Sequence, residues 1–126
     1  MMLNKLRDEV HKNAVEHGWW EKEREFGSLI ALMHSELSEA LEEHRNGHEP
    51  TEIYFSGVEP YDGRFETSEK PNEVCQKPEG IPAELADVII RILDYCGKKN
   101  IDIEEAIRIK HEYNKTRPYR HGGKRI

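Results

Sequence analysis

Apolar side chains recur at steps of three and four residues in four segments of the chain, and this spacing places them on one face of an α-helix. The first segment spans residues 3 to about 17, and Gly18 ends it because glycine disfavours the helical backbone. The second spans residues 26–41, and Asn46 and Gly47 supply its stop signal. The first half of the chain therefore predicts two amphipathic helices.

Two more helices are predicted in the second half of the chain. One begins near Pro82, because proline is tolerated in the first helical turn, and ends at Gly97. The other follows Asp102, which has the spacing of an N-cap residue, and stops before Pro118. Four amphipathic helices in a chain of this length predict a single domain over residues 1–126 with an all-α fold, a bundle of about four helices.

A long irregular loop is predicted between the second and third helices. Residues 47–80 contain four prolines and four glycines, which exclude a long regular helix. Residues 51–55 have the composition of a short strand, but a linker of this length favours a functional or mobile loop. Its aromatic side chains either pack on the bundle or close over a substrate as a lid; these are Tyr54, Phe55, Tyr61 and Phe65.

The composition favours a cytoplasmic protein with no membrane partner. Charged residues make up 35% of the chain, and no window approaches the roughly 18 apolar residues of a membrane span. The N-terminal residues contain no apolar core of a secretory signal. The two cysteines, Cys75 and Cys96, have no paired spacing, so we expect ordinary thiols.

Charge is distributed unevenly along the chain. Residues 110–126 contain six Lys or Arg and one Glu, whereas the whole chain has a net charge of -6. An acidic body with a basic tail argues against a nucleic-acid polymer as partner, because duplex-binding proteins spread positive charge over a face. It suits carboxylates that hold cations and basic residues that meet phosphate. The alternative is a solvated acidic surface with a disordered tail.

Two pairs of carboxylates have the spacing that brings them to one face of a helix. Glu36 and Glu39 are three residues apart on the second predicted helix, and Glu84 and Asp87 are three apart on the third. If these helices pack antiparallel, four carboxylates converge, which is costly unless divalent cations bind there. Oxygen ligands select hard ions, so the pattern indicates magnesium, or manganese, and not zinc. A charged helix surface without a metal is the alternative.

The last predicted helix carries a polar stripe. Lys110, Asn114 and Arg117 lie at positions i, i+4 and i+7, so they share one face of the helix. Lys and Arg are usual partners of phosphate, and Arg engages it bidentately. Together with carboxylates that hold a metal, this stripe indicates a site for a metal-bound polyphosphate. The alternative is a solvated face whose cations interact with the negative end of the helix dipole.

Three motifs follow one another along the predicted helices: Ser35-Glu-Leu-Ser-Glu-Ala40, Glu84-Leu-Ala-Asp-Val88 and Lys110-x-x-Tyr-Asn-x-x-Arg117. In this order they resemble the MazG-like all-α nucleoside triphosphate pyrophosphatase superfamily, whose signature is EExxE followed by ExxD. Ser35 stands where the signature has its first Glu, a position that is not usually a metal ligand. The resemblance does not cover residues 47–79. It implies that magnesium is held around a nucleoside triphosphate by four acids, which are Glu36, Glu39, Glu84 and Asp87.

The resemblance is nearest to the deoxycytidine triphosphate pyrophosphatase branch of the superfamily. In that branch a histidine and a tryptophan precede the first acidic pair and contribute to the nucleotide pocket, and His11 and Trp20 stand at the similar positions. Lys110 and Asn114 resemble the nucleotide-contacting residues of the last helix. For Trp20 the alternative is packing in the core. The family also implies a homodimer or homotetramer, which the short, polar chain independently favours.

The resemblance implies a hydrolase that cleaves a nucleoside triphosphate, such as a deoxynucleotide, to monophosphate and pyrophosphate, as in dNTP housecleaning. Magnesium would neutralise phosphate charge and acidify the attacking water. Lys110 and Arg117 would bind the departing pyrophosphate, so that catalysis consists mainly of positioning and electrostatics. Either Glu36 or Glu39 would accept the proton from water.

Two alternatives to this activity remain open from the sequence. One is a non-catalytic helical module of the same fold, either a nucleotide sensor or a protein-interaction unit, for which Ser35 and the unassigned loop leave room. The other is a phosphohydrolase of the same family with a different substrate, such as a phosphoribosyl-ATP intermediate of histidine synthesis.

Overall fold

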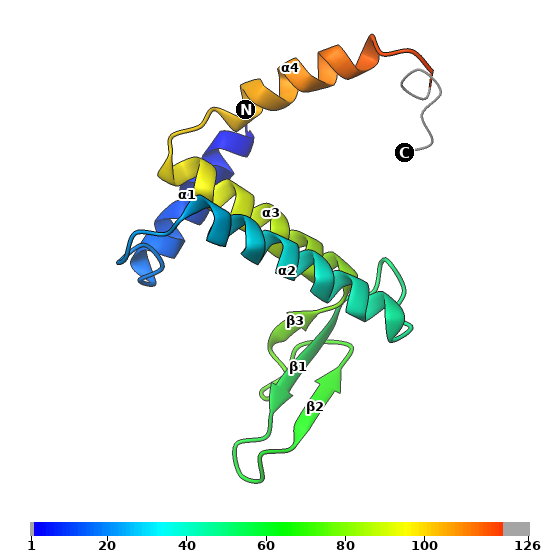
Figure 1. Ribbon diagram of the computed structural model, residues 1–126. Helices are drawn as coiled ribbons and strands as arrows, with labels where there is room; N and C mark the ends of the chain where they lie inside the picture. The colour runs from blue at the N-terminus through cyan, green and yellow to red at the C-terminus, as the bar shows by residue number, and fades with distance from the viewer. Residues whose placement is uncertain (1, 120–126) are drawn as a thin grey trace. The chain divides into compact units, whose positions relative to one another are not determined.

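The computed structural model describes residues 2–119 (Figure 1). Part of the predicted basic tail, including Arg120, Lys124 and Arg125, lies outside the described residues. All four predicted helices are present, and their bounds are α1 (Met2–Glu16), α2 (Phe26–Arg45), α3 (Ile81–Lys98) and α4 (Ile103–Lys115). Asp102 caps α4, since its side chain accepts a hydrogen bond from the backbone N–H of Glu105.

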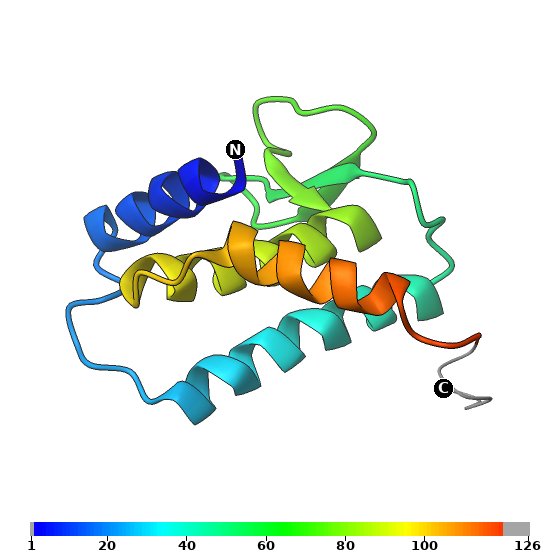
Figure 2. The same ribbon diagram turned by 90° about the horizontal axis from the view of Figure 1, so that it is seen from above.

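The prediction of an all-α fold with an irregular loop is wrong. Within residues 2–119, the segment between α2 and α3 forms a three-stranded antiparallel sheet of β1 (Tyr54–Val58), β2 (Phe65–Ser68) and β3 (Lys77–Glu79). The strand order is β2-β1-β3, with Phe55 opposite Ser68 and Tyr54 opposite Glu79. The chain is therefore mostly helical, and its small sheet is formed by the segment that joins α2 to α3 in the sequence (Figure 2).

The prolines and glycines of this segment exclude a helix but allow a sheet. Pro78 lies in β3, an edge strand, where a residue without a backbone N–H is tolerated. Pro60 and Gly63 lie in the turn between β1 and β2, which is closed by a hydrogen bond from the Glu59 N–H to the Arg64 carbonyl. Residues that predicted irregular structure thus occupy a hairpin turn and an edge strand of the sheet.

The described chain forms two compact units, and the division between them falls within α3. The first unit contains α1, α4 and the part of α3 from Leu93 onward. Asn4 of α1 donates from its backbone to Glu104 over 2.7 Å and from its side chain to Asp102 over 2.9 Å. Arg7 donates to the carbonyl of Ile101 over 2.7 Å. These bonds join the start of α1 to the start of α4.

The second unit contains α2, the sheet and the part of α3 up to Ile92. Glu36 and Arg91 form an ion pair, while Glu39 lies beside Glu84, so these two helical segments run antiparallel. Figure 1 shows the sheet projecting to one side of α2 and α3, from the N-terminal end of α3. The buried residues of this unit include Leu29, Ala40, Ser56 and Cys75.

Both helices of the second unit also leave large apolar side chains exposed. Leu37 and Leu41 of α2 are 46% and 56% exposed, and Leu85 and Ile89 of α3 are 44% and 53% exposed. Within residues 2–119, every helix is too short or too polar to cross a membrane.

Gly80 connects β3 to α3 in a conformation that other residues rarely adopt. Its φ is +111°, and a Cβ atom there would lie 2.3 Å from the carbonyl oxygen of Glu52. The carbonyl of Gly80 also accepts the hydrogen bond from the N–H of Glu84. The junction between the sheet and the helix therefore requires glycine.

We predict that Gly80→Ala lowers the free energy of unfolding by roughly 2 kcal/mol or more, through backbone strain and the clash with Glu52. Urea unfolding followed by circular dichroism measures this loss. Gly27→Ala is the matched control, because Gly27 lies in α2 with nothing within 4 Å of its added Cβ, and it should cost no stability. Equal unfolding midpoints for Gly80→Ala and the parent would contradict the required glycine.

Candidate functional site

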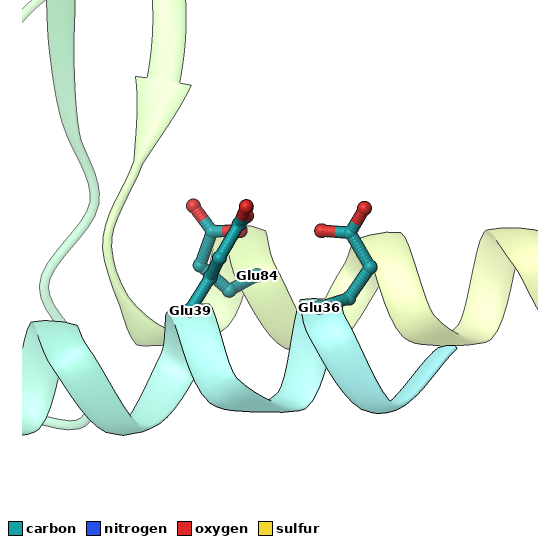
Figure 3. A group of neighbouring side chains, drawn as sticks. All are labelled: Glu36, Glu39 and Glu84. Atoms are coloured by element: carbon teal, nitrogen blue, oxygen red, sulfur yellow. The ribbon is translucent and has the colours of Figure 1, made fainter. Parts of the chain in front are cut away.

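Three of the four predicted metal-ligating carboxylates come together in the second unit. Glu36 and Glu39 lie one turn apart on α2, and Glu84 lies on the first turns of α3. One carboxylate oxygen of each lies within 4.8 Å of the others. Figure 3 shows the three carboxyl groups on the same side of the two helices. We call Glu36, Glu39 and Glu84 the first carboxylate group.

Within the first carboxylate group, Glu84 has a buried oxygen without a hydrogen-bond partner. The residue is 7% exposed, and its Oε2 is the only buried side-chain oxygen or nitrogen in the described part of the chain that has no hydrogen-bond partner. The pKa of Glu84 is raised to about 7, first by burial, then by the hydrogen bond and charge of Glu39 and by the charges of Asp87 and Glu79. Burial and the neighbouring carboxylates therefore disfavour an ionised Glu84 unless a positive charge offsets it.

Asp87 is the fourth predicted ligand, and it belongs to neither of the carboxylate groups with metal-binding geometry in residues 2–119. Its side chain is exposed, one turn along α3 from Glu84. Its charge contributes to the raised pKa of Glu84. The structure thus brings three of the four predicted carboxylates within ligand distance and places Asp87 beside them.

Arg91 is a partner of this group that the sequence analysis missed. Its Nε and Nη2 donate to Oε1 of Glu36 over 2.9 and 2.8 Å. Glu36 is 9% exposed, so this ion pair holds a buried carboxylate in place and offsets its charge. The signal that could have found Arg91 is its place on the third helix, one turn after the ExxD motif.

Two further carboxylates, Glu43 and Glu79, were also missed. Together with Glu84 they have ligand atoms within 4.8 Å of one another. Glu43 lies four residues after Glu39, so helical spacing could have found it. Glu79 lies in β3, inside the segment predicted as a loop, and nothing in the sequence pointed to it.

His11 and Trp20 meet at one carboxylate in the first unit. Trp20 Nε1 donates to Oδ1 of Asp94 over 2.9 Å, and His11 Nδ1 lies 2.9 Å from the same oxygen. The two rings pack edge to face, with centroids 6.0 Å apart, and Lys98 Nζ lies 5.3 Å from the Trp20 ring centroid. Asp94 was missed, although an acid beside Leu93 in an apolar helical stripe is itself a signal.

The predicted polar stripe lies on α4 and just after its end, also in the first unit. Lys110 and Asn114 line an open pocket of about 420 Å³, with His111 and the apolar residues of the same face. The cations of Lys110 and Arg117 lie 5.6 and 6.0 Å from the ring centroid of Tyr113. Lys110 and Asn114 are exposed, and Arg117 is half-buried.

The first carboxylate group fits a hard divalent cation. All its donors are carboxylate oxygens, which favour magnesium or manganese over softer metals. The Oε2 of Glu84 is buried without a donor, as expected for an oxygen that binds a cation. Arg91 holds Glu36 in place, as outer partners of metal-ligating carboxylates do.

The raised pKa of Glu84 predicts a pH dependence of stability in the metal-free protein. The folded state holds the Glu84 proton up to about pH 7, whereas the unfolded state releases it near the ordinary pKa of 4.5. The folded state binds more protons than the unfolded state in this window. The contribution of Glu84 to the free energy of unfolding is therefore greatest below about pH 4.5, and it decreases as the pH rises to about 7.

We expect Glu84→Gln to lose less stability than the parent between about pH 4.5 and 7, because glutamine has no proton to release. Urea unfolding with a chelator present measures both proteins at each pH. The other titrating groups are common to both, so the difference isolates Glu84. Parallel stability curves over this window would contradict the raised pKa.

The described side chains therefore provide an acidic group suited to a hard cation, and an aromatic pair held by Asp94. The chain matches no protein-family model, no curated protein and no solved structure.

Proposed function

We propose that the protein is a magnesium-dependent nucleoside triphosphate pyrophosphohydrolase of the MazG-like type. The observation that carries this proposal is the convergence of Glu36, Glu39 and Glu84 from two antiparallel helical segments, with a buried oxygen of Glu84 that has no donor. Helical spacing alone produces acidic pairs on many surfaces, but it does not bury an acid among other acids. Such burial is costly unless a cation binds.

Glu36, Glu39 and Glu84 hold the metal in this proposal, and the nearby Asp87 adds negative charge. Bound there, magnesium or manganese would neutralise charge on phosphate oxygens and lower the pKa of a water. Glu39 is the better candidate of the two proposed proton acceptors. Its side chain is exposed, whereas Glu36 is buried in its ion pair with Arg91.

The residues that the resemblance assigns to nucleotide contacts belong to the first unit. Lys110 and Arg117 carry the positive charge suited to the pyrophosphate end of the substrate, and Asn114 adds an amide on the same face. His11 and Trp20 are the proposed base contacts, and Asp94 holds both in position through the 2.9 Å bonds to its Oδ1. A carboxylate that accepts from both rings restricts their orientations.

A homo-oligomer is part of the same proposal. Leu37, Leu41, Leu85 and Ile89 are each at least 44% exposed, and this is apolar surface that a second copy of the chain can bury. A homodimer or homotetramer would remove this surface from water. Light scattering of the purified protein gives the number of copies directly.

A nucleotide sensor of the same fold is the competing function. It requires the same carboxylates and the same nucleotide contacts but no turnover. Metal-dependent nucleotide binding measured by calorimetry, with no product formed, would favour the sensor.

The test of the proposed activity is pyrophosphate release from ribo- and deoxynucleoside triphosphates with and without magnesium. We expect metal-dependent release that Glu39→Gln lowers by roughly 100-fold or more, because a lost ligand costs at least as much as a lost outer partner. Glu69→Gln is the matched control, since Glu69 is an exposed acid of the segment before β3 and should retain the parent rate. Product identification also separates pyrophosphate release from hydrolysis of a phosphoribosyl-nucleotide.

Glu39→Gln turnover within a few-fold of the parent would remove the proposed metal role of Glu39. Absence of pyrophosphate above background from folded parent protein, with every nucleotide, would contradict the proposed reaction.

A further inference from the structure

A second group of carboxylates lies beside the first and comes from three different elements. Glu43 lies in the last turns of α2, Glu79 ends β3 and Glu84 lies in α3. One oxygen of each lies within 4.8 Å of the other two. We call these residues the second carboxylate group, and they line an open pocket of about 210 Å³ that also includes Glu39 and Lys77.

Negative charge predominates in this pocket. Its lining contains five glutamates and one lysine. Lys77 Nζ lies 3.3 Å from Oε1 of Glu79, and this hydrogen bond, followed by the Glu79 charge, raises the pKa of Lys77. The Lys77 side chain is 75% exposed, so water screens most of its charge. One exposed ammonium offsets only part of the charge of five carboxylates.

Glu84 provides a second observation that points to a bound cation. It is 7% exposed and belongs to both carboxylate groups. Its Oε2 is buried and receives no hydrogen bond. A carboxylate has two oxygens, each able to bind a cation, so a glutamate shared by two acidic groups has the arrangement of a bridging ligand.

The other two carboxylates are held by hydrogen bonds from the sheet. Tyr54 of β1 donates its hydroxyl to Glu43, with 3.0 and 2.9 Å to the two oxygens. Ser56 of the same strand donates its hydroxyl to Oε1 of Glu79 over 3.0 Å. Donors of this kind orient ligating carboxylates and leave further lone pairs free for a cation.

His48 restricts Tyr54 from the other side. The two rings are stacked, with centroids 4.6 Å apart, and His48 Nε2 also lies 3.4 Å from Oε2 of Glu43. Burial, followed by the hydrogen bond to Glu43, raises the pKa of Tyr54, so its hydroxyl keeps the proton that it donates. Glu43 is therefore positioned before any cation arrives.

We propose that Glu43, Glu79 and Glu84 bind a second hard divalent cation, magnesium or manganese, with Glu84 shared between this site and the first carboxylate group. The inserted sheet supplies one ligand directly, Glu79, and positions another, Glu43, through Tyr54. The second site goes beyond the proposed reaction and does not depend on it, because cation binding is measured without a nucleotide.

The test is a titration of the metal-free full chain with Mn²⁺, in which free Mn²⁺ is followed by electron paramagnetic resonance. The titration is run at about pH 8, above the raised pKa of Glu84, so that proton release competes little with cation binding. We expect two Mn²⁺ per parent chain, and one per chain for both Glu79→Gln and Glu43→Gln. Glu69→Gln, the exposed control, should bind two.

Two more variants separate a ligand role from a purely structural one. Glu39→Gln should lose the first cation and keep the one bound by the second carboxylate group. Lys77→Met should bind the second cation roughly two- to fivefold more tightly, because it removes a competing charge near Glu79. A sheet that only stabilises the fold would give no such gain. Circular dichroism verifies the helices, and if one glutamine variant is unfolded the other decides.

The proposal is overturned if the parent binds a single Mn²⁺ that Glu79→Gln and Glu43→Gln retain, or if both variants bind Mn²⁺ as the parent does. This outcome is distinct from failure of the proposed reaction. A protein that binds two Mn²⁺ but releases no pyrophosphate keeps the second site and lacks the activity. A pyrophosphatase whose Mn²⁺ binding is unchanged in both variants shows the reverse.

Discussion

A carboxylate that is buried among other carboxylates needs either a proton or a cation, because water no longer screens its charge. Glu84 is in this position, with Glu39, Asp87 and Glu79 all raising its pKa. Arg91 offsets the charge of Glu36, but no donor reaches the Oε2 of Glu84. A proton on Glu84 relieves this charge at low pH, and in the proposed function a divalent cation would do so at neutral pH, which would link metal binding to proton release.

The inserted sheet gives this acidic region its second half. β3 ends at Glu79 and α3 begins at Ile81, so Gly80 alone separates a strand carboxylate from the helix that carries Glu84. At the other end of the segment, Tyr54 begins β1 and holds Glu43 at the end of α2. The segment between the two helices thus orients Glu43 near the end of α2 and places Glu79 just before the start of α3.

The first unit shows a related use of a buried acid. Asp94 is 7% exposed, and its Oδ1 lies 2.9 Å from both Trp20 Nε1 and His11 Nδ1. One carboxylate therefore orients two aromatic rings that lie far from it in the sequence. The resemblance to MazG-like enzymes pointed to His11 and Trp20 without indicating what holds them, and the structure supplies Asp94.

The sequence by itself determined the four helices and the acidic pairs on two of them. Helical periodicity and caps such as Asp102 are local, so a single segment contains the whole signal. Only the tertiary structure decided the sheet, because strand pairing joins residues that are not neighbours and the prolines and glycines there suit edges and turns as well as loops. Helical position marks Arg91 and Asp94 as candidates, but only the tertiary structure shows what Arg91, Asp94 and Glu79 contact. Their roles come from distances across the fold, and spacing along one helix or strand does not encode those distances.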